Sequence, residues 1–205
     1  MFNKVNCNYM RWTKTELEKL YLHTKKSSKE ISDLFGCSEH KVNYWMKKHG
    51  IQKRSVSEAV YQKLNPNGDP FVCEKPKTME EAFLYGLGLG LYWGEGTKSD
   101  KHSVRLGNTN PKLIKKFIEF LINRYSIDRK KMRFGLQIFS GMSPSEGLSF
   151  WSKELGFPKS QFQKVVVTHA RGVGTYRQKT KHGVLTVYYS NKKLRDIIGA
   201  VIDDL

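Results

Sequence analysis

Cysteines, acidic residues and long apolar runs are scarce in this chain of 205 residues. The three cysteines, Cys7, Cys37 and Cys73, form no C-x-x-C pair and no zinc-site spacing with the six histidines. We therefore expect reduced thiols in a cytoplasmic protein. The most apolar run, residues 82–94, is shorter than the roughly 20 residues that span a bilayer, and the first residues lack the apolar core of a signal peptide. We expect no membrane partner.

Acidic side chains number 19 against 36 Lys and Arg, which gives a formal net charge of +17. The excess is spread along the whole chain and does not form a basic tail. A surface field of one sign attracts polyanions and speeds their capture. Because solubility does not require so large an excess, the charge favours an intracellular, nucleoid-associated protein that binds nucleic acid.

Helix-capping patterns predict three helices in the first 50 residues. Thr13 and Glu16 form a capping box, a second helix starts at Ser27 or Ser28, and Ser38 caps a third. Gly36 ends the second helix and Gly50 the third. The apolar residues expected to be buried between these helices are Leu17, Leu20, Tyr21, Ile31, Leu34, Phe35, Val42, Trp45 and Met46.

A helix, a short turn at Gly36-Cys37 and another helix make a helix-turn-helix layout. Residues 27–51, SSKEISDLFGCSEHKVNYWMKKHGI, resemble the helix-turn-helix of resolvases and small bacterial regulators. This resemblance implies double-stranded DNA as the partner and the third helix as the recognition helix, since Asn pairs with adenine and Lys reaches guanine or phosphate. The side chains expected to contact DNA are His40, Lys41, Asn43, Tyr44, Lys47 and Lys48. Lys53 and Arg54 form either an arm on the DNA or a solvated linker.

Proline and glycine cluster at residues 61–78, which predicts a linker. We therefore expect a helix-turn-helix domain at 1–60 and a second domain at 79–205. The second domain begins with a glycine-rich segment, residues 79–96, that is compatible with a strand or with a helix whose Gly86, Gly90 and Gly94 share one face. It has no G-x-G-x-x-G or G-x-x-x-x-G-K phosphate-loop spacing, and we expect no small-molecule cofactor.

Residues 88–96, GLGLYWGEG, resemble the signature motif of the LAGLIDADG homing endonuclease family, in which this segment is a helix. The positions that match the motif are Gly90, Leu91, Gly94, Glu95 and Gly96. Gly88, Leu89 and Trp93 depart from it, but Glu95 falls on the second acid, which is the family's essential carboxylate. The predicted fold class is therefore α+β: a LAGLIDADG-like αβ saddle domain preceded by a small all-α helix-turn-helix domain.

The sequence after the motif fits this element order. Strands are predicted at 104–108, 131–139, near 162–171 and at 183–190, and helices at 110–125, 144–155 and after Asn191. In the family, one motif per chain implies a homodimer whose motif helices pack together, here through Gly86, Gly90 and Gly94. Saddle-shaped sheets lie along the DNA, and the residues this implies as contacts are Arg105, Lys131, Arg133, Gln137, Lys164, His169, Arg171, Arg177 and Lys179. Each of them is equally interpretable as a solvated surface side chain.

A carboxylate at a helix end, beside an accessible backbone carbonyl, suits Mg²⁺. The resemblance implies that Glu95 and Gly96 bind this metal, that Lys98 adds positive charge to the catalytic site, and that two such sites hydrolyse phosphodiesters. Without the resemblance, Glu95 would be an ordinary surface acid. The predicted function is Mg²⁺-dependent, site-specific double-strand DNA cleavage by a homodimer on a near-palindromic site. The alternatives are a non-catalytic transcriptional regulator built on the same fold, or an RNA maturase.

Overall fold

The computed structural model describes residues 11–169 and 181–204. The chain divides into two compact units, Met1–Asp69 and Pro70–Leu205, and each is described by itself. The boundary between them falls inside the proline- and glycine-rich residues 61–78. No helix among the described residues is both long enough and apolar enough to cross a membrane.

The first unit is helical, and its local signals act as the sequence predicts. Its elements are α1 (Lys14–Glu18), the π-helical turn η2 (Lys19–His23), α2 (Ser28–Phe35), α3 (Glu39–Lys48) and α4 (Val56–Leu64). Thr13 and Ser27 form capping boxes, and Ser38 caps α3. The three predicted helices are thus confirmed, whereas α4 was not foreseen and runs into the residues assigned to the linker.

The core of this unit contains Trp12, Leu17, Ile31, Val42 and Met46, all buried. Leu34 was expected there, but that prediction is wrong, because its side chain is 44% exposed. In the short helix α2, only the side chains on the same face as Ile31 pack against the other helices. Leu34, three residues further along, lies at the edge of that face and points outward.

The second unit combines helices with one mixed sheet, which confirms the α+β class. Its elements are α5 (Met79–Glu95), β1 (Val104–Asn108), α6 (Pro111–Tyr125), η3 (Arg129–Lys131), β2 (Arg133–Phe139), α7 (Pro144–Leu155), η4 (Lys159–Gln161), β3 (Val166–Thr168), β4 (Val184–Tyr189) and α9 (Lys192–Asp203). The strand order is β1-β4-β2-β3. Among the paired strands of the described residues, β2 and β3 are parallel and the other pairs are antiparallel. The glycine-rich segment forms α5 and is therefore a helix.

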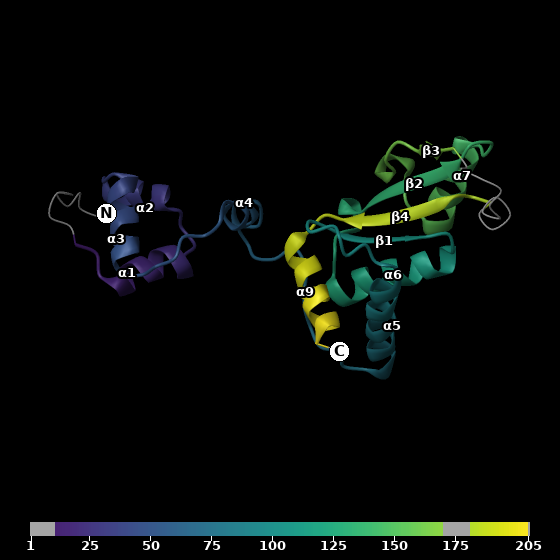
Figure 1. Ribbon diagram of the computed structural model, residues 1–205. Helices are drawn as coiled ribbons and strands as arrows, with labels where there is room; N and C mark the ends of the chain where they lie inside the picture. The colour runs from purple at the N-terminus through teal and green to yellow at the C-terminus, as the bar shows by residue number, and fades with distance from the viewer. Residues whose placement is uncertain (1–10, 170–180, 205) are drawn as a thin grey trace. The chain divides into compact units, whose positions relative to one another are not determined.

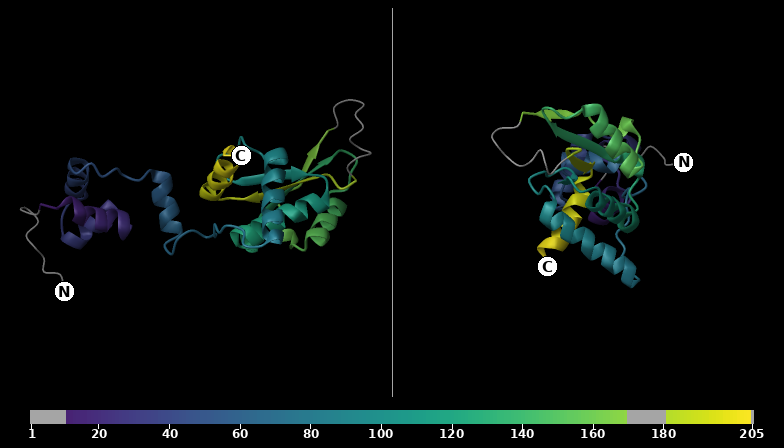
Figure 2. Two further views of the ribbon diagram at one scale, coloured as in Figure 1. Left: turned by 90° about the horizontal axis from the view of Figure 1, so that it is seen from below. Right: turned by 90° about the vertical axis from the view of Figure 1, so that its right-hand side faces the viewer.

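The sheet buries one face and leaves the other open. Figure 1 shows α5, α6 and α9 on one side of the strands, and the view from below in Figure 2 shows these helices on the viewer's side. Along each of β1, β2 and β4, buried residues alternate with half-buried or exposed ones. The side chains of the buried face are Val104, Leu106, Phe134, Leu136, Ile138, Leu185, Val187 and Tyr189. The alternate residues form the surface that we call the open face.

Two predicted strand residues lie outside strands. Lys131 belongs to the η3 turn, because Asp128 accepts the backbone N–H of Lys130 through its side chain and starts a turn there. Lys164 precedes β3, which spans only three of the residues expected for that strand. Within the described part of the chain, β3 is an edge strand that bonds to β2 alone, so few ladder hydrogen bonds define its length.

Candidate nucleic-acid interface

Helix α3 presents most of its predicted DNA contacts to solvent. His40, Tyr44 and Lys47 are exposed, and the Lys48 ammonium lies 4.8 Å from the centre of the Trp45 ring. Lys41 and Asn43 are half-buried, and the side-chain oxygen of Asn43 is buried without a hydrogen-bond partner among the described residues. The exposed cations and Tyr44 therefore form the accessible part of this helix.

Arg54 contacts other residues of the first unit through both its side chain and its backbone. Its guanidinium lies 4.1 Å from the centre of the Tyr21 ring and donates to the backbone carbonyl of Lys25 at 3.1 Å. Its backbone N–H donates to the Tyr21 hydroxyl at 2.9 Å. These contacts assign Arg54 a structural role that the sequence did not reveal, while the neighbouring Lys53 is exposed.

Cross-strand register arranges the open face in four rows, of which the fourth is Phe139 and Thr168. Two residues separate successive rows along a strand, so neighbouring rows lie about 7 Å apart. The first row is Arg105, Tyr188 and Arg133; the second is Gly107, Thr186 and Gly135; the third is Val184, Gln137 and Val166. Sequence reasoning selected Arg105, Arg133 and Gln137 but missed the rest, although the alternation along residues 184–189 is a signal for Thr186 and Tyr188.

The first row is cationic and held in place. The Arg105 guanidinium lies 4.8 Å from the centre of the Tyr188 ring and also pairs with Asp100. The backbone N–H of His102 hydrogen-bonds to Asp100 and, with other contacts, lowers the pKa of that carboxyl. Asp100 therefore stays ionised near neutral pH and keeps Arg105 in position. Arg133 donates to two backbone carbonyls, at 2.7 and 2.8 Å.

The second row places a glycine on each side of Thr186. A Cβ added at Gly107 would lie 3.0 Å from the Thr186 hydroxyl oxygen, and one added at Gly135 would lie 2.9 Å from the Tyr188 ring. Larger residues at either position would displace the first or second row. The two glycines therefore leave room for the side chains of Thr186 and Tyr188.

The third row is uncharged. Gln137 is exposed, and its side-chain N–H donates to the Thr168 hydroxyl oxygen at 2.9 Å. Val184 and Val166 are its cross-strand neighbours, and Val166 is largely exposed. Lys131, Lys164 and His169 are exposed as well. Arg171, Arg177 and Lys179 lie outside the described residues.

Helix α5 has one packed face and one free face. Gly88 packs so closely against α6 that an added Cβ would overlap the Phe120 ring. A Cβ at Gly86, Gly90 or Gly94 would meet nothing within 4 Å. These three glycines share the free face with Phe83 and Trp93, which are 70% and 58% exposed. The glycine that α5 needs for packing within this chain is therefore Gly88, one of the two residues that open the motif and depart from it.

Glu95 ends α5 with an exposed side chain that forms no hydrogen bond or ion pair with the described residues. Gly96 follows, where an added Cβ would overlap the Tyr92 carbonyl and ring. The Lys98 ammonium donates to the Trp93 carbonyl, and Arg195 of α9 donates to the Lys98 carbonyl at 2.9 Å. The structure thus gathers Glu95, Gly96 and Lys98 at one end of α5.

The ligands that this end of α5 offers to a metal are oxygens. The described residues contain no group of three His, Cys, Asp or Glu side chains that could hold a metal ion. Glu95 and nearby backbone carbonyls supply hard oxygen ligands of the kind that Mg²⁺ prefers.

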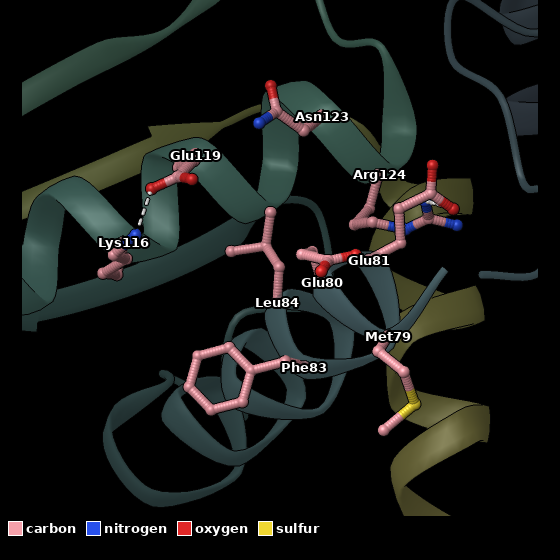
Figure 3. Close-up of a pocket in the computed structure, with 9 residues that line it drawn as sticks. All are labelled: Met79, Glu80, Glu81, Phe83, Leu84, Lys116, Glu119, Asn123 and Arg124. Atoms are coloured by element: carbon pink, nitrogen blue, oxygen red, sulfur yellow. Dashed lines mark hydrogen bonds and ion pairs between the residues drawn. The ribbon is translucent and has the colours of Figure 1, made fainter. Parts of the chain in front are cut away.

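A cavity of about 650 Å³ lies at the opposite end of α5, against α6 (Figure 3). Arg124, which is buried, pairs there with Glu81 at 3.0 Å, and Lys116 pairs with Glu119 at 2.8 Å. The ionic groups of this cavity largely satisfy one another. It begins near Met79, whereas Glu95 ends the same helix, so the cavity is separate from the candidate catalytic end.

The chain matches no known family model, and neither a curated protein sequence nor a solved structure is significantly similar to it.

Proposed function

We propose that this protein binds double-stranded DNA through the open face of its sheet and through helix α3. The observation that carries the proposal is the open face itself. A sheet with helices on one side carries two arginines on the other, together with Thr186 between two glycines and Gln137 between two valines. Arginines anchor phosphates while polar side chains reach base edges, and the chain's net charge of +17 favours capture of a polyanion.

We further propose that the protein is a Mg²⁺-dependent, site-specific endonuclease that acts as a homodimer, with a saddle formed by two sheets. The free face of α5 supports this assembly, because exposed Phe83 and Trp93 beside three glycines would allow two helices to approach closely. A two-fold axis along this face would bring the two Glu95 side chains to the same region. Each Glu95 would hold a divalent cation, which supplies activation of water and stabilisation of the leaving oxygen. Lys98 would add positive charge beside the phosphate.

The cleavage experiment compares the wild type with Glu95→Gln on duplex sites selected from a randomised library, with Mg²⁺, Ca²⁺ or EDTA present. The substitution keeps the size of the side chain and removes the charge that holds the cation. We expect it to abolish cutting and to leave DNA affinity within a few fold, because Glu95 is not a cationic contact. Trp93→Ala is the control, and we expect it to affect assembly more than the requirement for metal.

Tight binding of the wild type to its selected site without cutting in any divalent metal would favour the transcriptional-regulator alternative. Preference for structured RNA over duplex DNA would favour the maturase alternative.

The dimer is tested with Phe83→Glu. This side chain is 70% exposed within one chain, so a charge there should leave the chain folded and disfavour burial between two copies. We expect light scattering to show a dimer for the wild type and a monomer for the variant. A dimer of unchanged stability in Phe83→Glu would exclude the α5 face as the interface.

A further inference from the structure

Gln137 is a predicted DNA contact whose side chain is hydrogen-bonded to a neighbouring strand. Its amide nitrogen donates one hydrogen to the Thr168 hydroxyl oxygen at 2.9 Å, from β2 to β3. A primary amide carries two N–H donors and one carbonyl oxygen. Among the described residues, the second N–H and the oxygen have no partner. The Thr168 contact therefore presents one donor and one acceptor, side by side, above the open face.

This pair of groups matches one base edge in the major groove. Adenine offers an acceptor at N7 and a donor at N6, which an amide can engage with its N–H and its oxygen. Guanine offers two acceptors, N7 and O6, so the amide oxygen would face the guanine oxygen. An amide that turned over could avoid that repulsion, but its oxygen would then have to accept from the Thr168 hydroxyl, which reverses the hydrogen bond that the structure shows.

The neighbours of Gln137 suit a base edge better than a phosphate. Val184 and Val166 flank it in register, and both carry methyl groups on the open face. Apolar side chains contact the C5 methyl group of thymine. The cationic row lies two rows away, about 14 Å along the strands. Along β2, the open face thus carries Arg133 at one end and Gln137, between two valines, two rows away.

We infer that Gln137, oriented by Thr168 and flanked by Val184 and Val166, reads an adenine in the major groove next to a thymine. This inference rests on the proposed binding of duplex DNA by the open face. It does not depend on cleavage or on the dimer.

The test is selection from a randomised duplex library with the full chain, in EDTA so that cutting does not interfere. We expect the wild type to enrich adenine at one position of its site, with roughly tenfold or greater discrimination, as for other bidentate contacts. Gln137→Ala should lose that preference at that position alone. Thr168→Val should retain binding and narrow the discrimination between adenine and guanine, because the amide is then free to turn.

Two further variants keep the test independent of folding defects. Gln137→Glu carries only acceptors and should shift the preference at the same position to cytosine, whose N4 donates. A gained preference of this kind cannot come from misfolding. Arg133→Ala is the matched control on the same strand, and it should weaken binding to all sequences without changing the preferred base.

The possible outcomes distinguish a failure of the proposed function from a failure of the inference about Gln137. If the wild type binds no duplex, the proposed function fails and the inference fails with it. If the wild type binds duplex and Gln137→Ala selects the same bases, only the inference is overturned. A preference for guanine that is lost in Gln137→Ala would also overturn the inference.

Discussion

Gly88 and Gly90 lie two residues apart in α5 and have different surroundings. An added Cβ at Gly88 would overlap the Phe120 ring of α6, and one at Gly90 would meet nothing within 4 Å. Gly88 is buried and Gly90 is exposed. The first glycine therefore serves the packing of this chain, while the second is free to serve a partner.

We expect Gly88→Ala to destabilise the second unit by about 1–3 kcal/mol, the usual cost of overpacking a core. In a Phe83→Glu background, which removes the proposed dimer, Gly90→Ala should leave the unit as stable or stabilise it by up to about 1 kcal/mol, since alanine is the better helix former. Denaturant unfolding monitored by circular dichroism would measure both. Equal destabilisation by the two substitutions would contradict the packing of α5 on α6.

Three helices of the first unit begin with a capping box. Thr13, Ser27 and Ser55 each accept a backbone N–H and are met by a glutamate three residues later. The backbone N–H of Ser27 hydrogen-bonds to Glu30 and, with the Ser27 hydroxyl, lowers the pKa of that carboxyl; the equivalent contacts from Thr13 lower the pKa of Glu16. These helices therefore begin where short-range hydrogen bonds dictate.

The lowered pKa values predict how the stability of this unit depends on pH. A carboxyl whose pKa is lower in the folded chain contributes its stability above the ordinary glutamate pKa and loses it as the pH falls through the folded value. We expect helicity of the first unit to weaken between about pH 5 and pH 3. Glu30→Gln should flatten that dependence. Glu18→Gln, which alters no capping box, is the control, and an equally flat profile for it would refute the capping explanation.

At the scale of the whole molecule, each unit has its own cationic surface. Lys47 and Lys48 are exposed on α3 of the first unit, and Arg133 is exposed on β2 of the second. Each phosphate that a protein neutralises releases counterions and adds about 0.9 to the slope of log affinity against log salt. The salt dependence of binding can therefore report which surface contacts the DNA.

We expect Lys47→Ala and Arg133→Ala each to lower that slope by about one, and the double variant by about two. Fluorescence anisotropy with one labelled duplex between about 50 and 200 mM salt would measure it. Lys29→Ala is the control, because this lysine pairs with Asp33 at 2.8 Å on α2. An unchanged slope for either test variant would exclude that surface as a phosphate contact.

Much of this fold was predictable because its signals are local. The capping residues Thr13, Ser27 and Ser38, and Gly36 at the end of α2, act within a few residues of their own position, and the structure uses each of them as the sequence indicates. The same holds for β2, which lies within the predicted strand 131–139. The likeness of residues 88–96 to a family motif assigned a helix to a segment whose periodicity left strand and helix open.

The remaining features depend on contacts between residues far apart in the chain. Tyr188 lies between Arg105 and Arg133 because of the register of the strands. Arg54 contacts Tyr21 because the folded chain brings these two distant residues together. Alternation of apolar and polar residues indicates that a strand has two different faces, but the helices that pack against the strand decide which face is buried. The sequence by itself determined where the helices and most strands lie, because capping and periodicity act locally. Only the tertiary structure decided that Gly88 meets Phe120 and that Gln137 meets Thr168, because those contacts join separate elements.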